Sequence, residues 1–163
     1  MNSLNPTRRP AAASGTPRDW YPYRDEDGTD IVTPELLSSI APNGVAALTS
    51  EERQMRYAEL QALLRSAANG SLRDDNWKPV SRDPLLWELR WHWQDGSQHR
   101  GYFHEPSLEP DSTILAKVHK KQIIHSNKRE TQDRQNDAID EAGIRIRRGK
   151  DHRWGLGEAR KLN

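Results

Sequence analysis

Cationic and hydrogen-bonding side chains alternate with apolar ones between Leu85 and Lys121. The polar phase of this stretch carries two arginines, three histidines, three lysines, one tyrosine and a single acid: Glu88, Arg90, His92, Arg100, Tyr102, His104, Lys117, His119, Lys120 and Lys121. Guanidinium and ammonium groups packed closely repel one another unless a phosphate or a carboxylate lies among them. The pattern therefore predicts a surface that binds an anion. Its histidines could also transfer protons near neutral pH.

Three consecutive strands would bring these residues together. Between residues 87 and 93, tryptophan and leucine alternate with polar residues in a period of two, which is typical of a half-buried strand. Asp95-Gly96 then predicts a hairpin turn. A two-residue loop would mix apolar and polar side chains on each face, whereas an odd loop over residues 95–97 sets His92 beside Arg100 and keeps the faces separate. We therefore expect the odd loop, followed by a third strand that buries residues 114, 116 and 118.

Helices are expected before and after these strands in the sequence. Their starts carry capping signals, which are Thr33 before Pro34, Thr49 with Glu52, and Asn127 with Glu130. The third helix is expected to end at Gly143 and to pack lightly, because its apolar face is small. We assign no chemistry to the first two helices.

The two ends of the chain differ in composition from this middle part. Residues 1–18 are rich in Pro, Ala, Ser and Thr and are predicted to be a disordered tail. Residues 19–143 would form the folded domain, and residues 144–163 a basic tail. From Ile114 onward the chain has 13 Lys and Arg against 7 Asp and Glu. That excess predicts an anionic partner, for which the candidate contacts in the tail are Arg145, Arg147, Arg148, Lys150 and Arg153.

Composition excludes several classes of protein. The 163 residues are 33% hydrophobic and contain no run near the roughly 18 apolar residues of a membrane span. No apolar stretch follows the arginines near the start, so we expect no secretory signal and a cytoplasmic protein. Cysteine is absent, which excludes disulfides and thiolate metal sites. The six histidines lack metal-binding spacing, and glycine-rich phosphate loops are missing, so no metal or cofactor is expected.

Several strings in this order resemble a known family. They are WELR, a D-G turn, an R-x-Y-F strand, and an apolar strand ending in His-Lys-Lys before a capped helix. Together they are similar to the RelE/HigB toxin superfamily, and more narrowly to its HigB-like, phage-derived branch, over about residues 20–142. The resemblance implies an α+β fold, β-α-α-β-β-β-α, with an antiparallel twisted sheet packed on two N-terminal helices. Two departures are His125-Ser126-Asn127 in place of Thr-Pro, and Val118 in place of phenylalanine.

The resemblance implies a function as well. Such proteins are toxins of type II toxin–antitoxin systems, and many are endoribonucleases that cleave mRNA on the ribosome without a metal. The 2′-hydroxyl attacks the adjacent phosphate, which needs a base, charge stabilisation and a proton donor. Arg90 and Arg100 would clamp the phosphate, and one of the lysines at 117, 120 and 121 would be the base. His119 and His104 compete for the role of base or acid in proton transfer. Tyr102 would stack on the exposed nucleobase or donate to a phosphate, and His92 and His104 would contact RNA.

Two other readings stay open at this stage. A sister group with this fold poisons DNA gyrase by protein contact and performs no catalysis. A third possibility is a phage module that binds RNA or protein. The expected partners of a toxin are mRNA, the ribosome and a cognate antitoxin, for example a helix-turn-helix protein, and no membrane. Parallel assays of message cleavage and of DNA supercoiling separate the first two readings.

Overall fold

A computed structural model describes residues 8–41, 48–121, 125–158 and 160–163. The strands are β1 (Asp19–Pro22), β2 (Trp77–Pro79), β3 (Trp87–His92), β4 (Gln98–His104) and β5 (Ser112–Lys120). The helices are α1 (Val32–Ile40), α2 (Ser50–Ala68) and α3 (Lys128–Gly149), with short 3-10 turns η1 (Ala11–Ala13), η2 (Asp74–Asn76) and η3 (Lys150–Gly155). Within these described residues, no helix combines the length and apolar character needed to cross a bilayer.

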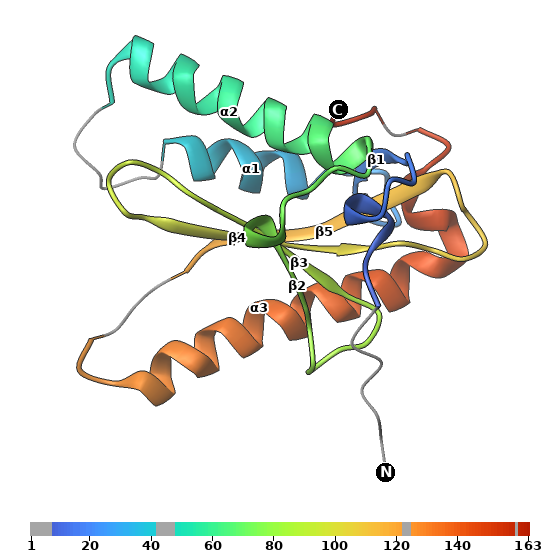
Figure 1. Ribbon diagram of the computed structural model, residues 1–163. Helices are drawn as coiled ribbons and strands as arrows, with labels where there is room; N and C mark the ends of the chain where they lie inside the picture. Colours follow the sequence, from blue (N-terminus) through green and yellow to red (C-terminus); the bar gives the residue numbers. More distant parts are fainter. Residues whose placement is uncertain (1–7, 42–47, 122–124, 159) are drawn as a thin grey trace.

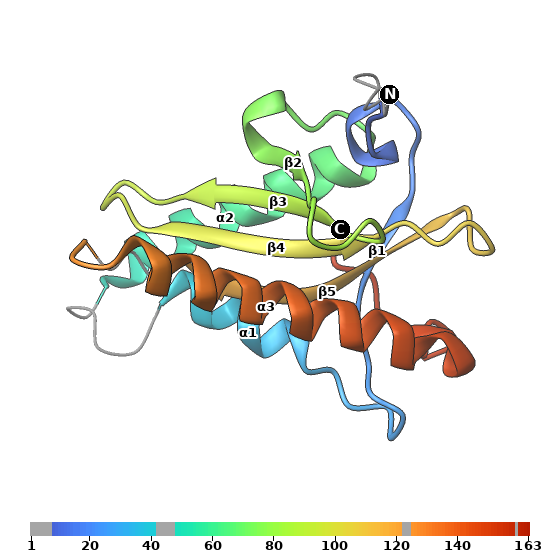
Figure 2. The ribbon, with the colours of Figure 1, turned by 90° about the horizontal axis from the view of Figure 1, so that it is seen from below.

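The strands form one mixed sheet in the order β1-β5-β4-β3-β2. The first strand runs parallel to β5, and all other neighbours are antiparallel. Figure 1 shows α1 and α2 on one face of this sheet and α3 on the other, and Figure 2 views the same layers from below. The α+β class is confirmed. The structure departs from the expected antiparallel sheet on two helices in three ways, namely the parallel β1–β5 pair, the additional strand β2 and a third layer made by α3.

The β3–β4 hairpin has the odd loop that the alternation predicts. Trp93 and Ser97 close it, with the Trp93 N–H donating to the Ser97 carbonyl at 3.1 Å. Arg90 therefore lies opposite Arg100 and Glu88 opposite Tyr102, a pairing two residues away from the expected one. Because side chains alternate with a period of two, a two-residue offset leaves every side chain on its predicted face.

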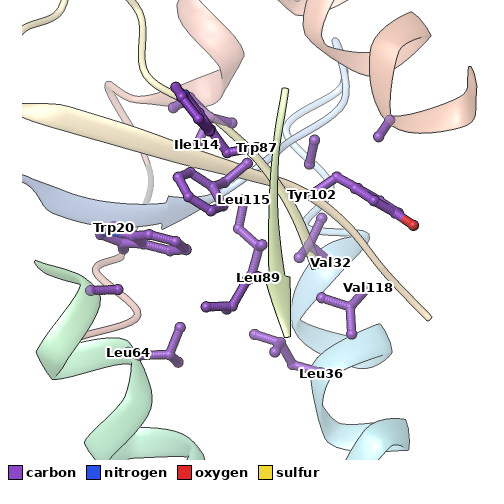
Figure 3. Packing of buried hydrophobic residues seen from close by; sticks show 14 of the residues in the cluster. Trp20, Val32, Leu36, Leu64, Trp87, Leu89, Tyr102, Ile114, Leu115 and Val118 are labelled. Atoms are coloured by element: carbon purple, nitrogen blue, oxygen red, sulfur yellow. The ribbon is translucent and has the colours of Figure 1, made fainter. Parts of the chain in front are cut away.

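The main core lies between the sheet and the first two helices. Leu89, Leu115 and Phe103 are fully buried on this face of the sheet, and Trp20 packs against Phe103 with ring centroids 4.7 Å apart. Figure 3 shows Leu89 and Leu115 on the side of Leu64, a residue of α2, while Tyr102 extends away from them. Truncating a buried leucine of this kind typically costs about 2–5 kcal/mol.

The third helix continues past Gly143, where the sequence predicts its end. The missing side chain at Gly143 lets the Asp83 carboxylate approach the helix closely, since a Cβ there would overlap the carboxylate. Asp83 then accepts hydrogen bonds from Arg147 at 2.6 and 3.1 Å. Gly143 thus provides close packing rather than a helix cap. The helix also buries Ile146, so it packs more firmly than expected.

Both predicted tails contain segments that pack on the domain. In the first, Ala12 is buried, and Glu105 accepts the backbone N–H groups of Ala11 and Ala12; residues 1–7 lie outside the described part. In the second, residues 144–149 extend α3. Leu162 donates its N–H to the Trp20 carbonyl at 2.7 Å, so the segment after η3 returns to β1.

Replacing Gly143 with alanine should destabilise the protein. In an ordinary helix this change is stabilising by about 0.5–1 kcal/mol. Here the new methyl group would displace the Asp83 carboxylate from Arg147, and we expect a loss of about 1–3 kcal/mol in the free energy of unfolding. Urea denaturation measures it.

Gly157→Ala is the matched control, because a Cβ at Gly157 meets nothing within 4 Å. Combining Gly143→Ala with Asp83→Ala should cost less than the sum of the two single changes. A stabilised Gly143→Ala variant would contradict this account of α3.

Candidate functional site

The polar side of the sheet is built from two rows of side chains that cross adjacent strands. One row is Lys78, Glu88, Tyr102 and Lys117, and the other is Arg90, Arg100 and His119. We call these seven residues, with Lys121 just beyond β5, the polar sheet face. The pairing of β2, β3, β4 and β5 places these side chains on one patch. The third helix contacts β4 and β5 on this side. It therefore covers part of a face that the sequence predicts to be exposed.

Two guanidinium groups on this face share one carboxylate. Glu88 Oε1 lies 3.1 Å from Arg90 Nε and 3.3 Å from Arg100 Nε. The Arg100 side chain is only 5% exposed, and its Nη atoms donate to the His99 carbonyl and to Gln98 Oε1 at 3.0 Å. The Arg90 side chain is 36% exposed. A ligand can therefore reach Arg90, while Arg100 adds positive charge from below.

Tyr102 and His119 form a hydrogen-bonded pair beside the arginines. The Tyr102 hydroxyl lies 3.0 Å from His119 Nε2, and the rings stack with centroids 5.5 Å apart. Burial, opposed by a hydrogen bond with the Lys120 backbone, lowers the pKa of His119 to about 4. Burial and then Glu88 raise the pKa of Tyr102. At neutral pH the tyrosine therefore keeps its proton and the imidazole is neutral, and Tyr102 is too deeply buried to stack on an RNA base.

The surroundings of Lys121 lower the pKa of its amine. Desolvation lowers its pKa, and the positive charges of Arg100 and Arg90 lower it further. The neutral amine is thereby more populated than in an isolated lysine. Lys121 also lines an open hollow of about 270 Å³ between β5 and α3, together with His119 and Lys120. A second hollow, of about 250 Å³, exposes Arg90 and His92 at the hairpin end.

Lys117 and Arg145 are held by carboxylates of the protein itself. Lys117 Nζ lies 3.0 Å from Glu35 and 3.1 Å from Glu141. Arg145 Nη2 lies 3.1 Å from Glu35 and 2.8 Å from Glu141. These four residues form a closed ion-pair cluster that links α1, β5 and α3. Both cations are thereby engaged within the fold, and we leave them out of the reactive set.

The remaining predicted residues lie away from Arg90. His104 sits at the opposite end of β4 from Arg100, where its Nδ1 donates to the Leu85 carbonyl at 2.8 Å. Arg147 is paired with Asp83 and Arg153 with Glu109. Arg148 and Lys150 are exposed. Lys120 is also exposed, and its Cα faces His99 rather than Arg100.

Sequence reasoning missed three residues near the site. Lys78 lies on β2 directly opposite Glu88, and the short strand gave no alternation from which to infer it. Gln135 of α3 donates to Glu88 Oε2 at 3.3 Å, a contact that depends on tertiary packing. His99 is fully buried beside Trp91 and Trp93. The period of two along β4 was the signal for His99, because it places residues 99, 101 and 103 on the apolar face.

No protein-family model, curated protein or solved structure matches this chain. Among the residues that the structure describes, no three His, Asp or Glu side chains gather in a group that could hold a metal ion.

Acid should weaken the fold through His99. Burial, and then the charge of Lys120, lowers the pKa of His99 to about 4 from 6.5. Below about pH 6.5 the unfolded chain binds a proton that the folded state excludes. The free energy of unfolding should therefore fall, by up to roughly 1.4 kcal/mol per pH unit for this group, as the pH drops from about 6.5 towards 4. Urea denaturation across this range measures the slope.

His99→Gln should reduce the slope of the free energy of unfolding against pH by the contribution of about one bound proton. His92→Gln is the control, because His92 is exposed on the neighbouring strand and should leave the slope as it is. Identical slopes for the two variants would rule out His99 as an acid-sensitive group beside His119, whose pKa is also lowered to about 4.

Proposed function

We propose that this protein is a metal-independent endoribonuclease of the RelE/HigB toxin type, which cleaves RNA by attack of a 2′-hydroxyl on the adjacent phosphate. The polar sheet face supports the chemistry, and the order of the strings described above supports the family. The same resemblance extends the proposal to mRNA on the ribosome as the substrate and to an antitoxin as the regulating partner.

One observation carries the proposal. Arg90 and Arg100 lie directly opposite each other on β3 and β4, a juxtaposition of like charges that is normally destabilising. A single carboxylate, Glu88, lies between them, and Lys121 is close enough for their charges to lower its pKa. The local balance is three cations against one anion. A phosphodiester at the exposed side of Arg90 would offset part of this positive excess.

The roles follow from exposure and protonation. Arg90 would hold the phosphoryl oxygens, with Arg100 and Lys78 raising the local potential. Lys121, with its lowered pKa, would accept the proton of the 2′-hydroxyl. The exposed imidazole of His92 lines the same hollow as Arg90 and would supply the proton to the leaving 5′-oxygen. The neutral Tyr102–His119 pair would position Lys121 by fixing the end of β5.

Arg90→Ala should reduce RNA cleavage strongly. Removing one donor that stabilises developing phosphoryl charge typically lowers the rate by about 10²–10³-fold. The change should leave the fold nearly intact, because the Arg90 side chain is partly exposed. The measurement is cleavage of a labelled RNA, alone and bound to translating ribosomes, with identification of 2′,3′-cyclic phosphate ends.

Arg82→Ala is the matched control, since it also removes one surface arginine that is paired with an acid, here Asp140, and Arg82 lines neither hollow of the polar sheet face. It should keep wild-type cleavage. If Arg90→Ala is folded and equally active, the assignment fails. If the wild type cleaves no RNA but blocks gyrase in a supercoiling assay, the enzyme proposal fails as a whole.

A further inference from the structure

A larger cavity opens at the other end of β4, away from the polar sheet face. It has a volume of about 630 Å³ and lies among the start of β3, the loop after β4, the end of α3 and η3. Pockets that hold small organic ligands commonly measure roughly 300–1,000 Å³ and combine apolar walls with a few polar groups. The size of this cavity fits a small molecule, and nothing in the proposed nuclease chemistry uses it.

The walls are largely apolar. Trp87, Ile146 and Trp154 are buried residues that line the cavity. Leu85 and Leu108 line it as well, but they are 38% and 81% exposed. Two leucines exposed at the mouth of one apolar cavity leave surface that a bound apolar group would remove from water.

The rim carries more positive charge than the protein itself neutralises. The cavity is lined by Arg8, Arg9, Arg147 and Lys150, against the single acid Glu105. Arg9 is paired with Asp74 and Arg147 with Asp83. Within the described residues, neither Arg8 nor Lys150 is paired with a carboxylate. Arg8 instead lies over the Trp87 ring, 5.0 Å from its centroid. The remaining charge suits a ligand with one anionic group.

One wall is held in a strained conformation. Arg153 and Trp154 have φ angles of 52° and 54°, in the left-handed region that residues with a side chain rarely adopt. This turn places the Trp154 indole 5.7 Å from the His104 ring, and Nε1 donates to the Ile146 carbonyl at 2.8 Å. Strained backbone of this kind often marks a functional site, because the surrounding structure must enforce it.

From the cavity, the rim charge and the strained wall together, we propose that this site binds a small amphiphilic anion. Its acidic group would face Lys150 and Arg8, and its apolar body would lie against Trp87, Trp154 and Leu108. The site is separate from the nuclease proposal, so either one can hold without the other.

Calorimetric titration of the full chain with straight-chain carboxylates, from butanoate to dodecanoate, tests the proposal. Each methylene that enters the cavity should tighten binding about fourfold, and the gain should stop once the cavity is full. Octanol, which has the same apolar body without the charge, should bind about tenfold more weakly than octanoate. Absence of binding for every chain length, or affinity that rises without a plateau, would overturn the proposal.

Variants locate the site. Lys150→Gln should weaken octanoate binding about tenfold and leave octanol binding unchanged, and Leu108→Asn should weaken both ligands. Arg148→Gln is the matched control, because Arg148 is an exposed cation two residues before Lys150, at the end of α3, that does not line the cavity. Equal loss of octanoate binding in Lys150→Gln and Arg148→Gln would show general charge attraction and reject the site. Circular dichroism confirms that each variant is folded.

Discussion

The carboxylate of Glu35 joins the three layers of this protein. Its Oε1 accepts the Val118 N–H at 3.0 Å, on the part of β5 beyond Leu115 where β1 no longer pairs. Its Oε2 lies between Lys117 and Arg145. The Glu35 carboxylate thus accepts the Val118 N–H, pairs with the two partly buried cations Lys117 and Arg145, and links α1 and α3 to β5. Leaving such cations unpaired is strongly unfavourable, so this contact fixes the strand that carries His119 and positions Lys121.

Internal pairing changes the meaning of the charge pattern. Lysines and arginines that look unpaired in the sequence form ion pairs with acids from distant parts of the chain. Glu35 is 82 residues before Lys117, and Asp83 is 64 residues before Arg147. Few cations remain for a ligand, and of the paired arginines Arg90 is the accessible one, with 36% of its side chain exposed against 5% for Arg100. A few unpaired cations on a largely neutralised surface agree with a net charge of only +1.

Local patterns predicted most parts of the fold that depend on neighbouring residues. Thr33 is an exception, because α1 begins at Val32 and Asp30, rather than Thr33, accepts the first free N–H groups of the helix. The Thr49–Glu52 capping box and the Asn127 cap form as expected, and strand alternation placed the arginines and Tyr102 on one face. Failures arose where distant segments meet. The sequence predicts a helix end at Gly143, but the helix continues there because Asp83 packs against the glycine. The sequence also predicts that Tyr102 is exposed, but Gln135 and the rest of α3 cover it. For the site, the correct strands and face were predictable, whereas the burial of Arg100 was not.

The two outer strands of the sheet offer little to a further strand. On one side β2 is three residues long and ends at Pro79, which has no N–H to offer. On the other, the Trp20 carbonyl accepts from Leu162 and the Trp20 N–H donates to the Asn163 side chain. Within the described residues, a strand from another molecule therefore finds little ladder to extend along β1 and β2. Covered outer strands of this kind disfavour strand-to-strand aggregation of a tryptophan-rich sheet. Any stable association would therefore be made through side chains rather than through backbone pairing.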